Sequence, residues 1–188
     1  EVKVKVAIGE FRYSDTVANN FRKAVDLIEM ASEDFVSLIC FGELFIGLNL
    51  IEPIPNALTN RLSYTAKRNQ INIVSGNIRA PAQFGKIRQV ALAISDEGVI
   101  IGQQEKLLPY PTERGSLVPG THLKTINTSL GNLCILGGAA VLDRSYQNMV
   151  SRIKPDILLL QYNFRNDEER ETIKSLALEI SKDAVPLV

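Results

Sequence analysis

The sequence predicts an α/β fold with mixed β-sheets. Apolar runs of strand length alternate with segments whose apolar residues recur at helical spacing, and this alternation begins at the N-terminus. The strands expected at residues 89–94 and 99–102 are joined by Ser-Asp-Glu-Gly, which favours an antiparallel hairpin beside the parallel strands. At 188 residues the chain is long enough to bury its own core, so we expect one domain over residues 1–188.

The N-terminal part predicts a strand–helix–strand unit. Residues 2–8 alternate as in a strand, and Ser14 or Asp15 is expected to cap the helix that follows. Residues 35–40 are almost entirely apolar, as in a strand that is covered on both faces. This order implies parallel pairing of the two strands through a right-handed crossover. The apolar residues at helical spacing are Val17, Phe21, Ala24, Val25 and Ile28.

The middle of the chain predicts a helix, further strands and one long loop. A helix is expected over residues 58–68 and a strand over residues 71–76, followed by a loop at Ala-Pro-Ala near residue 80. After the hairpin, residues 104–120 contain three prolines and two glycines and show little regular periodicity. Long loops of this kind frequently carry function.

The C-terminal part centres on a buried strand at residues 130–136. Gly137, Gly138, Ala139 and Ala140 follow it, so the end of the strand carries almost no side chains. Ligands of open α/β folds bind at the carboxyl ends of strands. Further along, the pattern predicts a helix from an Asp143 cap to Ile153, a strand at 156–161, a helix capped by Asn166 or Asp167, and the start of a strand at 184–188.

The composition excludes several classes of function. Lys and Arg number 21 and Asp and Glu number 21, so no net charge attracts nucleic acid or an acidic membrane. The apolar runs are too short to span a bilayer, and the first residues do not resemble a signal peptide. Cys40 and Cys134 lie inside apolar runs, which indicates reduced thiols in a cytoplasmic protein.

Three charged residues are candidates for a site. Glu43 is a lone carboxylate after a buried strand, where it needs a partner or a raised pKa unless it is solvated. Lys106 and Glu113 lie in the proline-rich loop, where each could equally be a surface charge. His122 is the only histidine, so we expect no His-based triad, no metal centre and no cofactor.

The motifs around these residues, in this order, resemble those of the nitrilase, or carbon–nitrogen hydrolase, superfamily. The resemblance covers essentially the whole chain and implies an α-β-β-α sandwich with mixed sheets. It also implies a homodimer and a C-terminal part, beyond residue 188, that this chain lacks. The motifs are Phe41-Gly42-Glu43-Leu44-Phe45, Glu105-Lys106-Leu107-Leu108, and Glu113-Arg114 followed by Leu117-Val118-Pro119-Gly120.

The resemblance implies roles for the three charged residues. In this family a Cys thiolate attacks an amide or nitrile carbon, and water then hydrolyses the covalent intermediate. Glu43 would be the general base, and the Lys106 ammonium would stabilise the oxyanion. Glu113 would be the supporting carboxylate that orients the other two.

The nucleophile is missing from its expected place. The family's Cys lies seven residues after a glycine that resembles Gly131, and in this chain that position is Gly138. Ala140 stands at the acidic position two residues later. Cys134 lies four residues earlier, about 13 Å back along a strand, which is too far for it to replace the nucleophile. We therefore expect Cys134 and Cys40 to be buried structural thiols.

Three hypotheses follow. The first is a pseudoenzyme that retains Glu43, Lys106 and Glu113 and binds a small amide-like or polar ligand or a protein partner. The second is an active amidase or nitrilase-type hydrolase of non-peptide C–N bonds with an unrecognised nucleophile, such as water activated by Glu43. The third is an interaction module in which the fold is a scaffold and the charges matter little. The missing nucleophile favours the first and third over an active enzyme.

Overall fold

The computed structural model describes residues 4–14, 16–164 and 166–181 of the chain. The helices are α1 (Val17–Glu33), α2 (Ala57–Asn69), α3 (Arg144–Ile153) and α4 (Asp167–Ser181), with short 3-10 turns η1 (Gln83–Gly85), η2 (Pro111–Glu113) and η3 (Ala139–Leu142). The strands are β1 (Val6–Gly9), β2 (Leu38–Phe41), β3 (Asn72–Val74), β4 (Ile78–Pro81), β5 (Ile87–Ile94), β6 (Ile100–Glu105), β7 (Thr125–Thr128), β8 (Gly131–Gly137) and β9 (Ile157–Gln161).

The strands form two mixed sheets. In the first sheet the order is β1-β2-β3-β5-β4, with β6 also paired to β5. β1, β2 and β3 are parallel to one another, whereas β5 is antiparallel to β3, β4 and β6. The second sheet has the order β7-β8-β9, with β7 antiparallel and β9 parallel to β8. The parallel pairing of the first two strands and the β5–β6 hairpin confirm the predicted α/β fold with mixed sheets.

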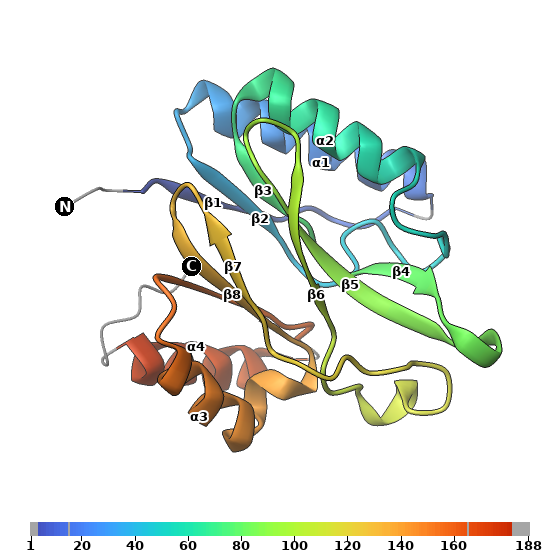
Figure 1. Cartoon of the computed structure of the whole chain (residues 1–188), viewed down its shortest axis with the longest axis vertical. Coiled ribbons are helices and arrows are strands. Elements are labelled where there is room, and N and C mark those ends of the chain that lie inside the picture. Colours follow the sequence, from blue (N-terminus) through green and yellow to red (C-terminus); the bar gives the residue numbers. More distant parts are fainter. Residues whose placement is uncertain (1–3, 15, 165, 182–188) are drawn as a thin grey trace.

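The elements stack in four layers (Figure 1). α1 and α2 cover the outer face of the first sheet, the two sheets lie face to face, and α3 and α4 cover the outer face of the second sheet. This arrangement is the predicted α-β-β-α sandwich. In the described part of the chain, no helix combines the length and the apolarity needed to cross a bilayer. The expectation of a single domain over residues 1–188 stays a prediction.

Each interface between layers has its own apolar cluster. The cluster under α1 and α2 includes Ile28, Leu62 and Ile73, and the cluster between the sheets includes Leu38, Cys40, Leu133 and Leu159. The cluster under α3 and α4 includes Cys134, Leu136, Val150 and Leu158. Because successive side chains of a strand point to opposite faces, β8 contributes Leu133 to the inner cluster and Cys134 to the outer one.

Several predicted boundaries are wrong, each for a local reason. Among the described residues of the first predicted strand, the regular strand begins only at Val6. The oxygen that caps α1 belongs to Thr16, which accepts from the Asn19 N–H, and not to Ser14. Asp15, the other predicted cap, lies outside the described residues. Phe35, predicted as the start of the second strand, has a positive φ of 56° and belongs to the turn before β2.

Two strands were not predicted. β4 was taken for a loop at Ala-Pro-Ala, but Pro81 is its last residue, a position on an edge strand where proline is tolerated. β7 reads Thr-Ile-Asn-Thr and buries only Ile126, so it carries no apolar run.

The caps at Asp143 and Asn166 are confirmed by hydrogen bonds from Ser145 N and Glu169 N. The strand predicted at residues 184–188 lies outside the described residues.

Candidate active site

The carboxyl ends of the strands from both sheets bring the predicted site residues together. Glu43 follows β2, Lys106 follows β6, and Gly138 follows β8, while Glu113 ends the turn η2. An isolated bridge between Leu108 and Gly138 joins the proline-rich loop to the end of β8. Residues far apart in the sequence thus meet at one edge of the sandwich, as expected for ligand sites of α/β folds.

The Lys106 ammonium is at the centre of this group. Its side chain is 0% exposed, and Nζ lies 2.9 Å from Glu43 Oε1 and 2.9 Å from Glu113 Oε2. Nζ also donates to Glu113 Oε1 at 3.1 Å and to Gln89 Oε1 at 3.4 Å, and it lies 4.1 Å from the centroid of the Tyr110 ring. We call Glu43, Lys106 and Glu113 the charged triad.

Glu43 is buried, and its carboxylate forms an ion pair and accepts hydrogen bonds from several residues. The side chain is 2% exposed, and besides Lys106 it accepts from Asn77 Nδ2 at 3.2 Å and from the Tyr110 hydroxyl at 3.0 Å. Burial raises the pKa of the Glu43 carboxyl above its usual range, although the charge and hydrogen bond of Lys106 and the hydrogen bond of Tyr110 act in the opposite direction. The alternative of a solvated glutamate at a strand end is therefore wrong.

Glu113 closes the triad on the other side of Lys106. Its side chain is 19% exposed, and Oε1 accepts from Gln89 Nε2 at 2.9 Å. Oε2 accepts from the main-chain N–H of Tyr110 at 2.9 Å, which ties the carboxylate to the start of η2. Lys106 and Glu113 are thus parts of one buried network and are not isolated surface charges.

Gly138 lies directly against Lys106. Its backbone has φ +66° and ψ −149°, a region that only glycine adopts readily. A Cβ atom built on Gly138 would overlap with Lys106 Cε and would lie 3.1 Å from Nζ and 3.3 Å from the main-chain oxygen of Leu108. The space that any side chain at position 138 would need is occupied by Lys106.

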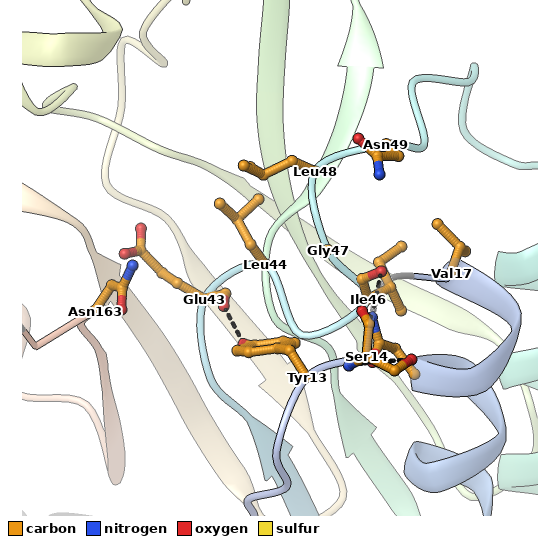
Figure 2. Close-up of a pocket in the computed structure, with 11 residues that line it drawn as sticks. Tyr13, Ser14, Val17, Glu43, Leu44, Ile46, Gly47, Leu48, Asn49 and Asn163 are labelled. Atoms are coloured by element: carbon orange, nitrogen blue, oxygen red, sulfur yellow. Dashed lines mark hydrogen bonds between the residues drawn. The ribbon is translucent and has the colours of Figure 1, made fainter.

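A pocket of about 440 Å³ opens beside Glu43 (Figure 2). In the figure the Glu43 carboxylate points toward Asn163, while Ser14, which precedes α1, and Val17, the first residue of α1, form the far end of the pocket. The Tyr13 hydroxyl donates to the main-chain oxygen of Glu43 at 2.9 Å. We call this the Tyr13–Asn163 pocket. It is lined by Tyr13, Ser14, Val17, Asn20, Glu43, Leu44, Ile46, Gly47, Leu48, Asn49 and Asn163.

The sequence model of the family described as Carbon-nitrogen hydrolase matches residues 5–176. The chain belongs to the carbon–nitrogen hydrolase family. A search of the curated proteins found no match.

Solved structures of this family share the fold. Nit3 of Saccharomyces cerevisiae, a member of branch 10 of the nitrilase superfamily, superposes with a TM-score of 0.84 at 19% identity, over 98% of this chain and 73% of that one. A carbon–nitrogen hydrolase from Helicobacter pylori G27 gives a TM-score of 0.81 at 15% identity, over 98% and 71%. An amidase from Nesterenkonia sp. gives a TM-score of 0.81 at 18% identity, over 98% and 74%.

Neither thiol of this family member lies at the end of β8. Cys40 is buried between the sheets, and Cys134 is buried under α3 and α4. Burial raises the pKa of both thiols to about 12. Their burial agrees with the prediction of structural thiols, because a reactive cysteine needs a thiolate that substrates can reach.

Four neutral residues around the triad were not predicted. Tyr110 and Asn77 donate to Glu43, Gln89 contacts both Lys106 and Glu113, and Gln161 donates to the main-chain oxygens of Phe41 and Ser75 at 2.8 and 2.9 Å. Gln161 offered a signal, since it is a polar residue at the end of the run Ile-Leu-Leu-Leu.

The region that the structure describes contains no group of His, Cys, Asp and Glu that could hold a metal ion.

Proposed function

We propose that this carbon–nitrogen hydrolase family member is a pseudoenzyme that retains the charged triad but does not form a covalent intermediate. Its pocket would bind a small amide-like or polar ligand, or a segment of a protein partner. The observation that carries the proposal is the contact between Gly138 and Lys106. Position 138 has no side chain, and Lys106 fills the place that one would occupy.

Covalent catalysis needs a nucleophile next to the base and the oxyanion stabiliser. A Glu-to-Gln mutant of the amidase from Nesterenkonia sp. AN1 has been seen with the acetamide moiety of fluoroacetamide added covalently at its active-site cysteine. In this chain no sulfur lies at the end of β8, and both thiols are buried in the core with pKa values raised to about 12. These features support a loss of covalent chemistry.

The retained charges have two explanations, which lead to different experiments. Lys106 is the shared counter-ion of two carboxylates, so the loss of Lys106 would leave both of them without a cation. The triad could thus persist for stability alone. The second explanation is ligand binding, and it is supported by the pocket that reaches Glu43.

The decisive test is ammonia release from a panel of amides and nitriles, with the Glu43→Ala variant assayed in parallel. The proposal predicts no release above the buffer rate from either protein. Release by the native chain that disappears in Glu43→Ala would refute the pseudoenzyme assignment. Binding of the same compounds, followed by NMR of the intact ligands, separates a ligand-binding pseudoenzyme from a scaffold whose pocket stays unused.

The alternative is an active amidase or nitrilase-type hydrolase that uses a water molecule activated by Glu43. The raised pKa of Glu43 and its position beside the pocket favour this alternative, since a general base works best when its pKa is near the working pH. Ammonia release that persists in a Cys40→Ser, Cys134→Ser double variant but is lost in Glu43→Ala would establish it.

The homodimer implied by the family and the cytoplasmic location inferred from Cys40 and Cys134 are part of the same proposal. Light scattering of the purified protein tests the dimer.

The scaffold version of the proposal predicts that Glu43→Ala leaves partner binding intact, whereas substitutions along a sheet edge abolish it.

A further inference from the structure

The N–H donors of the Lys106 ammonium all face acceptors of the protein itself. An ammonium has three N–H donors and no acceptor. In this chain the donors face Glu43 Oε1, the two oxygens of Glu113, and Gln89 Oε1. Lys106 is also absent from the described residues that line the Tyr13–Asn163 pocket. A carbonyl oxygen bound in this pocket would therefore find no free N–H on Lys106.

Glu43, in contrast, retains a free acceptor position. Its two oxygens can accept about four hydrogen bonds in total. Oε1 contacts Lys106 and Asn77, whereas the described residues give Oε2 a single donor, the Tyr110 hydroxyl at 3.0 Å. The Tyr13 hydroxyl donates to the main-chain oxygen of Glu43, so the lone pairs of its own oxygen can accept. The part of the pocket next to Glu43 thus offers acceptors.

The net charge of the charged triad also favours a ligand that donates hydrogen bonds to Glu43. Two carboxylates and one ammonium give one excess negative charge when all three groups are ionised. Glu43 is the only charged residue among those that line the pocket in the described part of the chain. An uncompensated charge at a site this buried is unfavourable, and either a proton on Glu43 or a cation in the pocket would relieve it.

We propose that the Tyr13–Asn163 pocket binds a small planar organic cation of the amidinium class in preference to a neutral amide. This inference rests on the proposed function, because it assumes that the pocket binds a ligand and does not hydrolyse it. An amidinium has the planar shape of an amide but presents N–H donors at both nitrogens. It would donate to Glu43 Oε2 and to the Tyr13 oxygen without requiring a donor from Lys106.

Acetamidinium and acetamide are a matched pair of probes, since they have nearly the same shape and differ in charge. Binding of each to the native protein is measured by ligand-observed NMR, which also shows whether the probe stays intact. Because hydrogen bonds to charged groups are the stronger ones, we expect acetamidinium to bind at least about tenfold more tightly than acetamide. The Glu43→Gln variant, nearly isosteric, should lose this preference.

A second measurement needs no variant. Lowering the pH protonates Glu43, whose surroundings include Lys106, Glu113, Tyr110 and Tyr13. The affinity for acetamidinium should fall as the pH is lowered through the pKa of Glu43, whereas that for acetamide should change less. Since acetamidinium stays cationic throughout, the loss reports the protein and not the probe.

The outcomes separate the two proposals. Acetamide binding as tightly as acetamidinium would overturn the preference for a cation and leave the ligand-binding pseudoenzyme intact. A preference for acetamidinium that persists in Glu43→Gln would also overturn the inference, because the charge would then act from elsewhere. If neither probe binds, the inference and the ligand-binding part of the proposed function fail together. Release of ammonia from acetamide would refute the pseudoenzyme itself.

Discussion

The end of the Lys106 side chain lies against the α-carbon of Gly138, in the space where a side chain at position 138 would begin. The two residues come from different sheets, Lys106 from the end of β6 and Gly138 from the end of β8. Lys106 is held there by Glu43 and Glu113, each with an oxygen 2.9 Å from Nζ. Gly138 thus makes a close contact between the two layers, and a cysteine at this position would disturb this contact.

Gly138 and its neighbour Gly137 should respond differently to the same substitution. Gly138→Ala forces a non-glycine residue into φ +66°, ψ −149° and pushes against Lys106, so we expect a loss of about 1–3 kcal/mol in the free energy of unfolding from the backbone alone. A Cβ on Gly137 would meet its nearest atoms at 3.6–3.8 Å, an ordinary contact distance. Gly137→Ala should therefore cost much less in urea unfolding; equal losses would contradict the account.

Lys106→Met should be strongly destabilising. The substitution leaves Glu43 and Glu113 buried without a cation, and breaking a buried ion pair in this way costs about 3–5 kcal/mol. Adding Glu43→Gln and Glu113→Gln to Lys106→Met should restore most of the stability. Lys174→Met serves as the control, because Lys174 and Glu171 are 57% and 67% exposed and such surface pairs contribute little to stability. Both comparisons use denaturant unfolding at one pH.

The stability of the native chain relative to Glu43→Gln should depend on pH. Burial raises the pKa of Glu43 in the folded state above the ordinary value of 4.5, so the folded state binds the proton more tightly than the unfolded state does. The resulting stabilisation is fully present below the unfolded pKa and is lost as the pH rises through the folded pKa. The free energy of unfolding of the native chain, relative to that of Glu43→Gln, should therefore decrease as the pH rises. An increase would mean that the attraction of Lys106 outweighs burial in setting the pKa of Glu43.

Gln161 should matter more for stability than other glutamines of the fold. Its Nε2 donates to the main-chain oxygens of Phe41 and Ser75, at the ends of β2 and β3, and so joins the second sheet to the first beside Glu43. Gln161→Leu leaves two buried acceptors without a donor, each worth about 1–3 kcal/mol. Gln147→Leu, which removes a single bond to Val141, is the matched control and should cost clearly less.

The sequence could predict which residues belong to the site but not how they interact. The motifs around Glu43, Lys106 and Glu113, together with the seven-residue spacing from Gly131, identified the triad and Gly138. Their burial and mutual contacts arise from the packing of two sheets that are distant in sequence, and no local pattern encodes that packing. The positive φ of Gly138 and the overlap with Lys106 were hidden for the same reason.

Secondary structure was predicted well where the apolar pattern is strong. The strand at β8 and the helix α3 were found because one is continuously apolar and the other begins with a clear Asp143 cap. β7 and β4 were missed because their pairing partners, and not their own side chains, make them strands. Tyr110 was missed because nothing in the proline-rich loop shows that its hydroxyl reaches Glu43.

The absence of a competent nucleophile is the central claim, and intact-mass spectrometry after incubation with fluoroacetamide tests it most directly. The acetamide moiety of this compound has been seen added covalently at the active-site cysteine of a Glu-to-Gln mutant of the Nesterenkonia amidase. With both thiols of this chain buried and Gly138 at the end of β8, we expect the mass of the native protein to stay unchanged. A single acetamide adduct on the native protein would contradict the account, because it would reveal a reactive nucleophile, and peptide mapping would then identify the modified residue.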